Sequence, residues 1–252
     1  MHPILVVLEL GEGSRPIGTY GTCAAIAIAI AGFGAARAAA RAGRDVPLTI
    51  AAVGCAVLGG ALGAWLLFGL VEWLRTGDPS PMWHGGGLVF FGAVPGAVIT
   101  LAIARRFFEL DVLRIAELSA PTTLAAHAIG RLGCFFGGCC YGRPTDVSWA
   151  VRYPAAIDPL GLLRHPSPIY ESVGLLALAL AFALVPPARP GSGRRAALWL
   201  GGYCALRFAL EGLRGDAVRG AFLGASTSQW IALAGLAFAF AWWRQGRSLR
   251  TV

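Results

Sequence analysis

The stretch LTIAAVGCAVLGGALGAWLLFGLVEWL, residues 48–74, decides the fold class, because Glu72 is its one charged side chain. A helix rises 1.5 Å per residue, and the hydrocarbon core of a bilayer is about 30 Å thick, so roughly 20 apolar residues cross it. Gly59 and Gly63 lie four residues apart, and small residues at this spacing let two membrane helices pack closely. The stretch therefore predicts a transmembrane helix held tightly against a neighbour.

Comparable stretches recur along the chain of 252 residues, which is 56% hydrophobic and 13% charged. This composition is typical of a polytopic membrane protein. The start, MHPILVVLELGEGSRPIG, has no basic region before an apolar core, so no cleavable signal peptide is expected. We predict an all-α polytopic membrane protein, one integral-membrane domain over 1–252, with seven transmembrane helices near 19–40, 48–74, 86–105, 112–137, 167–187, 196–213 and 224–243.

The distribution of arginine predicts the orientation, because basic residues collect on the cytoplasmic side of a membrane. An N-terminus outside and a C-terminus in the cytoplasm place the larger share of arginines in the inner loops and tail. This inner set contains Arg37, Arg41, Arg44, Arg105, Arg106, Arg114, Arg189, Arg194, Arg195, Arg244, Arg247 and Arg250. The segment 143–165 then forms an outer, periplasmic-side loop between the fourth and fifth spans.

Ionisable residues within the predicted spans or at their outer ends indicate a functional site, since charges in a membrane are costly. In this topology they gather in the outer half: Tyr20, Arg131, His165, Tyr170, Glu171, Arg207, Glu211 and Arg214. Arg207, Glu211 and Arg214 have i, i+4, i+7 spacing and are expected on one helix face. Guanidinium groups match phosphate oxygens in a forked geometry, which favours an anionic phospholipid as ligand. The alternative is structural: Arg131 pairs with Glu211 or Glu171 and locks helices together.

The segment GRLGCFFGGCCYGR, residues 130–143, adds three cysteines to this region, and four interpretations stay open. Cys134, Cys139 and Cys140 could pack a glycine-rich turn, form a disulfide on the oxidising outer face, bind a metal with His127, or supply a nucleophile activated by Arg131. Cys23, Cys55 and Cys204 lie in apolar runs and are expected to be small buried residues. We expect neither a metal nor another cofactor to be required.

Several motifs, in this order, resemble the prolipoprotein diacylglyceryl transferase family along nearly the whole chain. They are YG at Tyr20, GGLVFFG at 86–92, GRLG at 130–133 followed by YG at 141–142, RHPSPIYE at 164–171 and GYCALRFALEGLR at 202–214. The resemblance implies a seven-helix enzyme of the bacterial inner membrane with its N-terminus outside. It would move diacylglycerol from phosphatidylglycerol to the lipobox cysteine thiol of a prolipoprotein signal peptide and release glycerol phosphate. No nucleic acid partner is expected.

The resemblance also assigns residues. Arg131 and Arg207 would hold the phosphate, Glu211 would orient Arg207, and Tyr20, Tyr203 and His165 would line the cavity with Arg214, Cys134 and Cys139. The chain departs from the family pattern at three positions: Phe91 stands for a histidine, Cys134 for an asparagine and Cys139 for an acidic residue. Two alternatives follow: a relative with a different acceptor, and a non-catalytic, thiol-redox or metal-binding membrane protein on the same scaffold.

Overall fold

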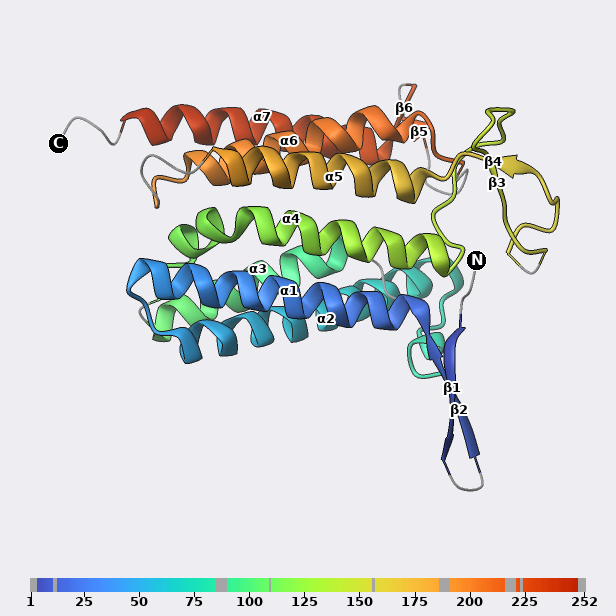
Figure 1. The fold of residues 1–252 in the computed structure, drawn as a ribbon, viewed down its shortest axis with the longest axis horizontal. Coiled ribbons are helices and arrows are strands. Elements are labelled where there is room, and N and C mark those ends of the chain that lie inside the picture. The colour runs from blue at the N-terminus through green and yellow to red at the C-terminus, as the bar shows by residue number, and fades with distance from the viewer. Residues whose placement is uncertain are drawn as a thin grey trace. The chain divides into compact units, whose positions relative to one another are not determined.

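The computed structural model describes residues 4–10, 13–84, 90–108, 110–155, 157–185, 191–215, 221–222 and 224–248. In this part of the chain there are seven α-helices (Figure 1): α1 (Thr19–Ala42), α2 (Val46–Thr76), α3 (Phe90–Phe107), α4 (Val112–Phe136), α5 (Ser167–Leu184), α6 (Arg194–Glu211) and α7 (Thr227–Ser248). Each predicted span overlaps one of them, so the all-helical class is confirmed. The start of the predicted span 86–105 lies partly outside the described residues.

Short elements join these helices. Three antiparallel hairpins are formed by β1 (Ile4–Leu10) with β2 (Gly13–Gly18), β3 (Val151–Arg152) with β4 (Leu163–Arg164), and β5 (Ala221–Phe222) with β6 (Ala225–Ser226). A single 3-10 turn, η1 (Ser80–Met82), follows α2. The sequence analysis did not predict the hairpins, because short paired strands leave no hydropathy signal comparable to that of a long apolar helix.

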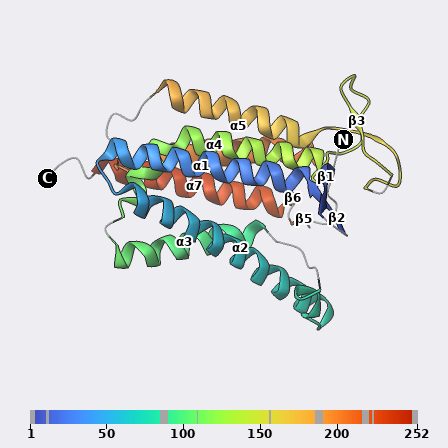
Figure 2. The ribbon, with the colours of Figure 1, turned by 60° about the horizontal axis from the view of Figure 1, so that its bottom comes forward.

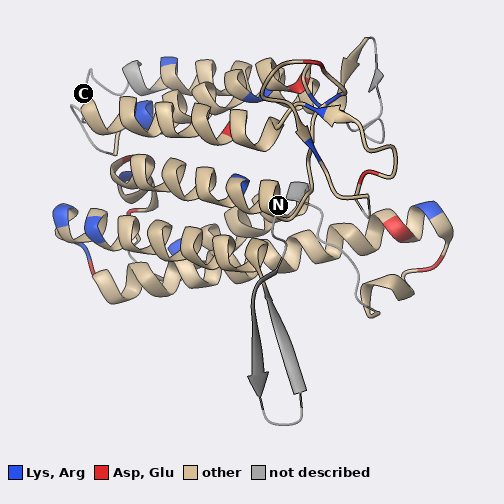
Figure 3. Cartoon of the chain, turned by 45° about the vertical axis from the view of Figure 1, so that its right-hand side comes forward, with Lys and Arg blue, Asp and Glu red and all other residues tan. Residues whose placement is uncertain are grey.

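Three of the described helices, α1, α2 and α5, are long and apolar enough to cross a membrane by length and composition. Figure 3 shows why, since few of the residues along the helices are charged. Much of the apolar surface of these helices is exposed, for instance Leu58 and Leu180. Exposed leucines along a helix of this length are what a lipid environment requires.

The contacts divide the chain into two compact units, Met1–Gly34 with Glu117–Val252, and Ala35–Ala116. In the unit Ala35–Ala116, α2 and α3 pack side by side (Figure 2). A Cβ added to Gly63 would lie 2.3 Å from the carbonyl oxygen of Gly92, and one added to Gly96 would lie 2.3 Å from that of Gly59. The backbones therefore touch where the sequence predicted close packing, and a larger side chain at Gly63 has no room.

The ends of α2 follow from its sequence. Asp45 is the N-cap, and its Oδ1 accepts a 2.7 Å hydrogen bond from the backbone N–H of Leu48. Gly77 ends the helix in the left-handed conformation, with φ 76°. Arg44 also forms a 3.1 Å ion pair with Asp111, which ties the start of α2 to the segment before α4.

The other unit is built on α4–α7 and the first part of α1. Its core lies between α4 and α5, where Leu124, Ala128, Leu175 and Ala179 are buried, and Trp199, Tyr203 and Leu206 of α6 pack against them. Because lipid tails are as apolar as leucine, close packing and polar contacts hold such helices together more than exclusion from water does. Ser172 of α5 supplies one of these contacts by donating a 3.1 Å hydrogen bond to the carbonyl of Ala128.

The outcome for the three cysteines in apolar runs differs from one position to the next. Cys204 is buried, as predicted, and Cys23 is partly buried. The prediction is wrong for Cys55, which is exposed on α2. Hydropathy alone does not separate a lipid-facing position from a buried one, because both accept a small apolar side chain.

Candidate functional site

Four charged side chains from three helices meet in the unit built on α4–α7. Arg131 of α4 lies 3.0 Å from Glu171 of α5, and Glu171 lies 3.3 Å from Arg207 of α6. Arg207 also forms a 2.7 Å ion pair with Glu211, one helical turn further on. The Glu171 side chain is 2% exposed, and that of Glu211 5%. The chain Arg131–Glu171–Arg207–Glu211 is therefore a network with buried carboxylates and partly exposed arginines, which we call the arginine–glutamate network.

Polar neighbours fix the geometry of this network. Ser226 of β6 donates a 3.0 Å hydrogen bond to Glu211, and Tyr203 is hydrogen-bonded to Arg131. Two guanidinium groups and two carboxylates balance in charge, as burial requires. The Nε of Arg131 is buried and has no hydrogen-bond partner among the described residues. Since an arginine offers five N–H donors, Arg131 keeps a donor for an anionic ligand.

The structure brings together the residues that the sequence predicted to be central. Arg131, Arg207, Glu211 and Tyr203 are in contact, and the i, i+4 pairing of Arg207 with Glu211 is confirmed. Glu171 was placed in this region from the sequence and named as a possible partner of Arg131, but it was not assigned a role at the site, although it bridges both arginines. The signal was present, because a glutamate in the apolar run after RHPSPIY is itself an ionisable residue within a span.

The position of Arg214 differs from the prediction. Helix α6 ends at Glu211, so Arg214 does not share a helix face with Arg207. An isolated antiparallel bridge pairs Arg214 with Gly142, and the N–H of Arg143 donates a 3.0 Å hydrogen bond to the carbonyl of Leu213. The turn after α6 is thus hydrogen-bonded to the segment that follows α4, and the helical conformation does not continue to Arg214.

Glycine is required at position 142 by this arrangement. The N–H of Gly142 donates a 2.9 Å hydrogen bond to the carbonyl of His165, so the segment 141–143 lies between residues 164–165 and 213–215. A Cβ on Gly142 would lie 2.6 Å from the carbonyl oxygen of Leu213 and 2.7 Å from that of His165. Three motifs far apart in the sequence therefore meet at Gly142.

Histidine 165 takes part in a separate polar group. Its Nδ1 lies 3.1 Å from the hydroxyl of Tyr170, which accepts a 2.7 Å hydrogen bond from the Trp149 indole N–H. Tyr20, in the first turn of α1, is half-exposed beside the end of α4, where a Cβ on Gly133 would lie 3.4 Å from its ring. His165 and Tyr20 thus lie at the margin of the site, and among the described residues no hydrogen bond or ion pair joins His165 to the arginine–glutamate network.

The segment 143–165 is ordered by one buried ion pair. Arg164 donates hydrogen bonds of 2.6 and 3.0 Å to Asp158, which is 1% exposed. These bonds hold the pKa of Asp158 below its ordinary value. The Arg164 guanidinium also lies 4.7 Å above the Tyr141 ring, and Tyr153 packs against that ring, where burial raises the pKa of Tyr153 to about 12. Tyr153 is therefore buried, whereas Trp149 is exposed.

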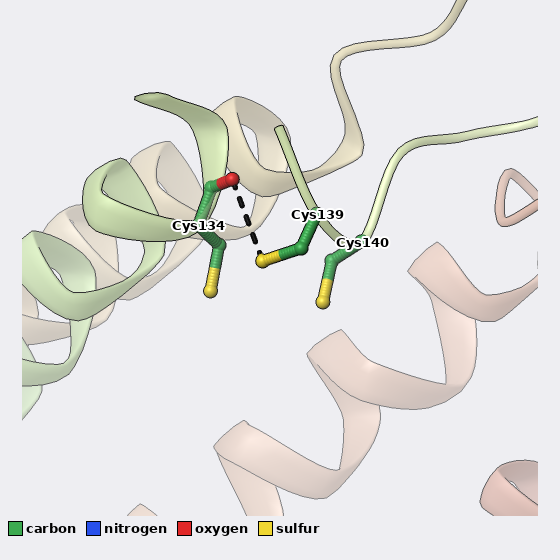
Figure 4. Close-up of side chains that lie close together, drawn as sticks. All are labelled: Cys134, Cys139 and Cys140. Carbon is green, nitrogen blue, oxygen red and sulfur yellow. Dashed lines mark hydrogen bonds between the residues drawn. The ribbon is translucent and has the colours of Figure 1, made fainter. Parts of the chain in front are cut away.

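The three cysteines after Gly133 form a cluster, which we call the thiol cluster. The sulfur atoms of Cys134, Cys139 and Cys140 all lie within 4.8 Å of one another. Figure 4 shows the three side chains together, with the Cys139 sulfur directed at the carbonyl oxygen of Cys134, 3.5 Å away. All three are free thiols. His127, the histidine of the metal-site alternative, does not join the cluster among the described residues, and its ring packs against Tyr203 with centroids 5.2 Å apart.

Cations border the thiol cluster on two sides. Arg131 Nη1 lies 4.0 Å from the Cys134 sulfur, and Arg214 is hydrogen-bonded to Cys140. Interaction with the neighbouring thiols of Cys134 and Cys139, and with the Arg214 guanidinium, holds the pKa of Cys140 well below its usual range. Interaction with Cys134 and Cys140, together with burial, raises the pKa of Cys139. Of the two cysteines beyond α4, only Cys140 is thus shifted toward the thiolate form.

Comparison with known proteins agrees with this geometry. Residues 6–244 match the family described as prolipoprotein diacylglyceryl transferase. The chain is 33% identical over 181 residues to phosphatidylglycerol–prolipoprotein diacylglyceryl transferase 2 of Clostridium perfringens, covering 70% of each chain. It is 35% identical over 182 residues to the Clostridium tetani transferase of that name, covering 70% of this chain and 72% of the relative. For the Gloeobacter violaceus transferase, identity is 35% over 209 residues, covering 77% and 76%.

Proposed function

The chain belongs to the prolipoprotein diacylglyceryl transferase family, and we propose that it transfers a diacylglyceryl group from phosphatidylglycerol to the lipobox cysteine of prolipoprotein signal peptides. The observation that carries this proposal is the arginine–glutamate network, in which Arg131 and Arg207 are both held by Glu171. A pair of partly exposed forked cations in an apolar bundle suits the phosphodiester of a lipid headgroup.

The donor lipid is bound through its phosphate. Arg131 offers its buried Nε, and Arg207 is oriented by Glu171 and Glu211. Because Glu171 already holds one guanidinium on each side, the two cations are positioned before the lipid arrives and lose little side-chain freedom on binding. We assign six further residues to the surrounding substrate-binding surface: Tyr20, Tyr203, His165, Arg214, Cys134 and Cys139.

The reaction is a displacement at the glycerol carbon that bears the phosphate. The acceptor sulfur forms a bond to this carbon while the carbon–oxygen bond to the phosphate breaks, and glycerol phosphate leaves. The phosphate oxygen gains negative charge as the bond breaks, so fixed guanidinium groups stabilise the transition state more than the ground state. Arg131 and Arg207 are the catalytic residues in this scheme, and Glu211 holds Arg207.

The proposal includes the topology. All seven helices cross the inner membrane of a bacterium, with the N-terminus outside, the C-terminus in the cytoplasm, and 143–165 as the outer loop. The distribution of arginine supports this orientation. Reporter fusions at Gly161 and Gly191 test it: Gly161 should be outside and Gly191 inside. Cytoplasmic signals from both fusions would overturn the assignment.

The activity is tested with purified protein, phosphatidylglycerol and a lipobox peptide. Mass spectrometry should show the peptide cysteine carrying the mass of one diacylglyceryl group, with glycerol phosphate released in equal amount. A peptide with serine in place of the cysteine is the matched control and should stay unmodified. Complementation of a strain depleted of its own transferase supplies the cellular test. Release of glycerol phosphate without modification of the peptide would overturn the acceptor assignment, and absence of both products would overturn the activity.

A further inference from the structure

We infer that Cys134, Cys139 and Cys140 bind one zinc ion, whose fourth coordination position takes up and activates the thiol of the acceptor cysteine. The inference rests on the proposed function for the identity of the acceptor. It departs from the expectation from sequence that no metal takes part, because the sequence does not show that the three sulfur atoms converge.

The geometry of the thiol cluster is close to that of a zinc site. The three sulfur atoms lie within 4.8 Å of one another. Zinc–sulfur bonds of about 2.3 Å in a tetrahedron separate the sulfurs by roughly 3.8 Å, so binding requires movements of about 1 Å or less. Small χ1 adjustments of cysteine side chains supply movements of this size. A disulfide would use two of the three sulfurs and leave the convergence of the third unexplained.

The backbone conformation of Cys140 supports the convergence of the three sulfur atoms. Cys140 has φ 63°, which makes it the one non-glycine residue with positive φ in the described part of the chain. This left-handed conformation is energetically unfavourable for a residue with a Cβ atom, so it persists only where the surrounding structure enforces it. Hydrogen bonds hold Cys140 in this conformation: Ser167 donates a 2.9 Å hydrogen bond to its carbonyl, and the N–H of Gly142 donates one to the carbonyl of His165. The result directs the third sulfur back toward the end of α4.

Charge also favours a metal–thiolate site. A zinc ion with three thiolates carries a net charge of −1, and a fourth thiolate makes it −2. Arg214, hydrogen-bonded to Cys140, and Arg131, 4.0 Å from the Cys134 sulfur, lie where this negative charge collects. Outer-shell N–H groups of this kind orient metal ligands and stabilise the bound metal.

Three protein ligands are the number found in catalytic zinc sites, which leave the fourth position to water or substrate. Among the described residues, no histidine or carboxylate joins the three sulfurs. A thiol that coordinates zinc loses its proton outright. This supplies an activation that nearby carboxylates are poorly placed to give, because Glu171 and Glu211 are both engaged by arginine.

The balanced step is as follows. The acceptor thiol binds zinc and releases its proton to water. The zinc-bound sulfur then forms a bond to the glycerol carbon, the carbon–oxygen bond to the phosphate breaks, and the released phosphate takes up a proton from water. Arg131 borders both the thiol cluster and the arginine–glutamate network, so it places the phosphate next to the sulfur that attacks.

Metal binding is measured on the full-length protein, purified under reducing conditions, freed of metal with a chelator and then incubated with Zn²⁺. We expect about one zinc per chain for the unchanged protein and for Cys55→Ser, a matched thiol outside the cluster. Cys134→Ser, Cys139→Ser and Cys140→Ser should each lose more affinity than the roughly 10–100-fold that removal of an outer-shell partner costs. Equal zinc content in all five proteins, selective uptake of Cu⁺ instead, or a disulfide within the cluster under these conditions would overturn the inference.

Activation of the acceptor is measured with Co²⁺ in place of zinc and without lipid. A lipobox peptide should increase the sulfur-to-cobalt charge-transfer absorption, whereas the same peptide with serine for cysteine should not. This reading needs no turnover, so it stands or falls separately from the donor assignment. Conversely, full transfer from phosphatidylglycerol by the metal-free protein would retain the proposed function and refute activation by zinc.

Discussion

Replacing Glu171 with glutamine tests the arginine–glutamate network most directly. Glu171 is 2% exposed in its side chain and bridges Arg131 at 3.0 Å and Arg207 at 3.3 Å. Removing one partner of a buried ion pair costs about 3–5 kcal/mol. Glutamine keeps an oxygen that can accept the 3.3 Å hydrogen bond from Arg207, so we expect the lower end, about 3 kcal/mol. At about 2–4 °C per kcal/mol for a chain of this size, the Tm should fall by roughly 6–12 °C.

The same change has a predicted kinetic signature. Loss of the carboxylate removes the internal competitor for the guanidinium groups, so KM for phosphatidylglycerol should fall. Each charged hydrogen bond that positions an arginine contributes about 1.5–3 kcal/mol, and its loss in the transition state corresponds to roughly a 10- to 150-fold decrease in kcat. The two parameters should therefore fall together, which a uniform loss of folded protein does not produce.

Glu117→Gln is the matched control. Glu117 is fully buried and accepts a 3.0 Å hydrogen bond from the backbone N–H of Arg195 at the start of α6, apart from the arginine–glutamate network. We expect a comparable loss of stability with unchanged kcat and KM for the folded fraction. The assays are thermal unfolding and initial rates of diacylglyceryl transfer at varied lipid. Wild-type Tm, kcat and KM in Glu171→Gln would refute the view that this carboxylate positions the two arginines.

Three further outcomes are expected. Arg131→Lys and Arg207→Lys should each lower kcat/KM about 10- to 150-fold while the protein still folds, because an ammonium group does not reproduce the forked geometry of a guanidinium. Wild-type rates in both variants would show that the arginines have only a structural role. The pKa of Asp158 is lowered in the folded protein, so its ion pair stabilises the segment 143–165 at pH values above the ordinary pKa, and this stabilisation is lost as the pH falls through the lower folded pKa. Asp158→Asn should therefore make this segment sensitive to protease at pH 7, as acid does for the unchanged protein. Equal protection of the variant and the unchanged protein at pH 7 would contradict this. Gly63→Val should destabilise the α2–α3 pair, because a Cβ there would lie 2.3 Å from a carbonyl oxygen. Circular dichroism on heating should show the lower Tm. Gly54→Val is the control, because a Cβ at Gly54 has no atom within 4 Å.

The sequence determined where the helices lie and which charged residues interrupt their apolar runs. Hydropathy along the chain is a local property, so each of the seven predicted spans overlaps a helix, with ends displaced by a few residues. Arg131, Arg207 and Glu211 were identified for the same reason, since a charge within an apolar run stands out without knowledge of its neighbours. The pairing of Arg207 with Glu211 followed from helical spacing alone.

Only the tertiary structure decided which residues from different helices meet. Glu171 joins Arg131 to Arg207 because α4, α5 and α6 pack together, and no spacing within one segment encodes that contact. Arg214 left the helix that its spacing predicted, because the bridge to Gly142 ends the helical repeat. The thiol cluster depends on the left-handed backbone at Cys140, and that conformation is fixed by hydrogen bonds from residues distant in the chain.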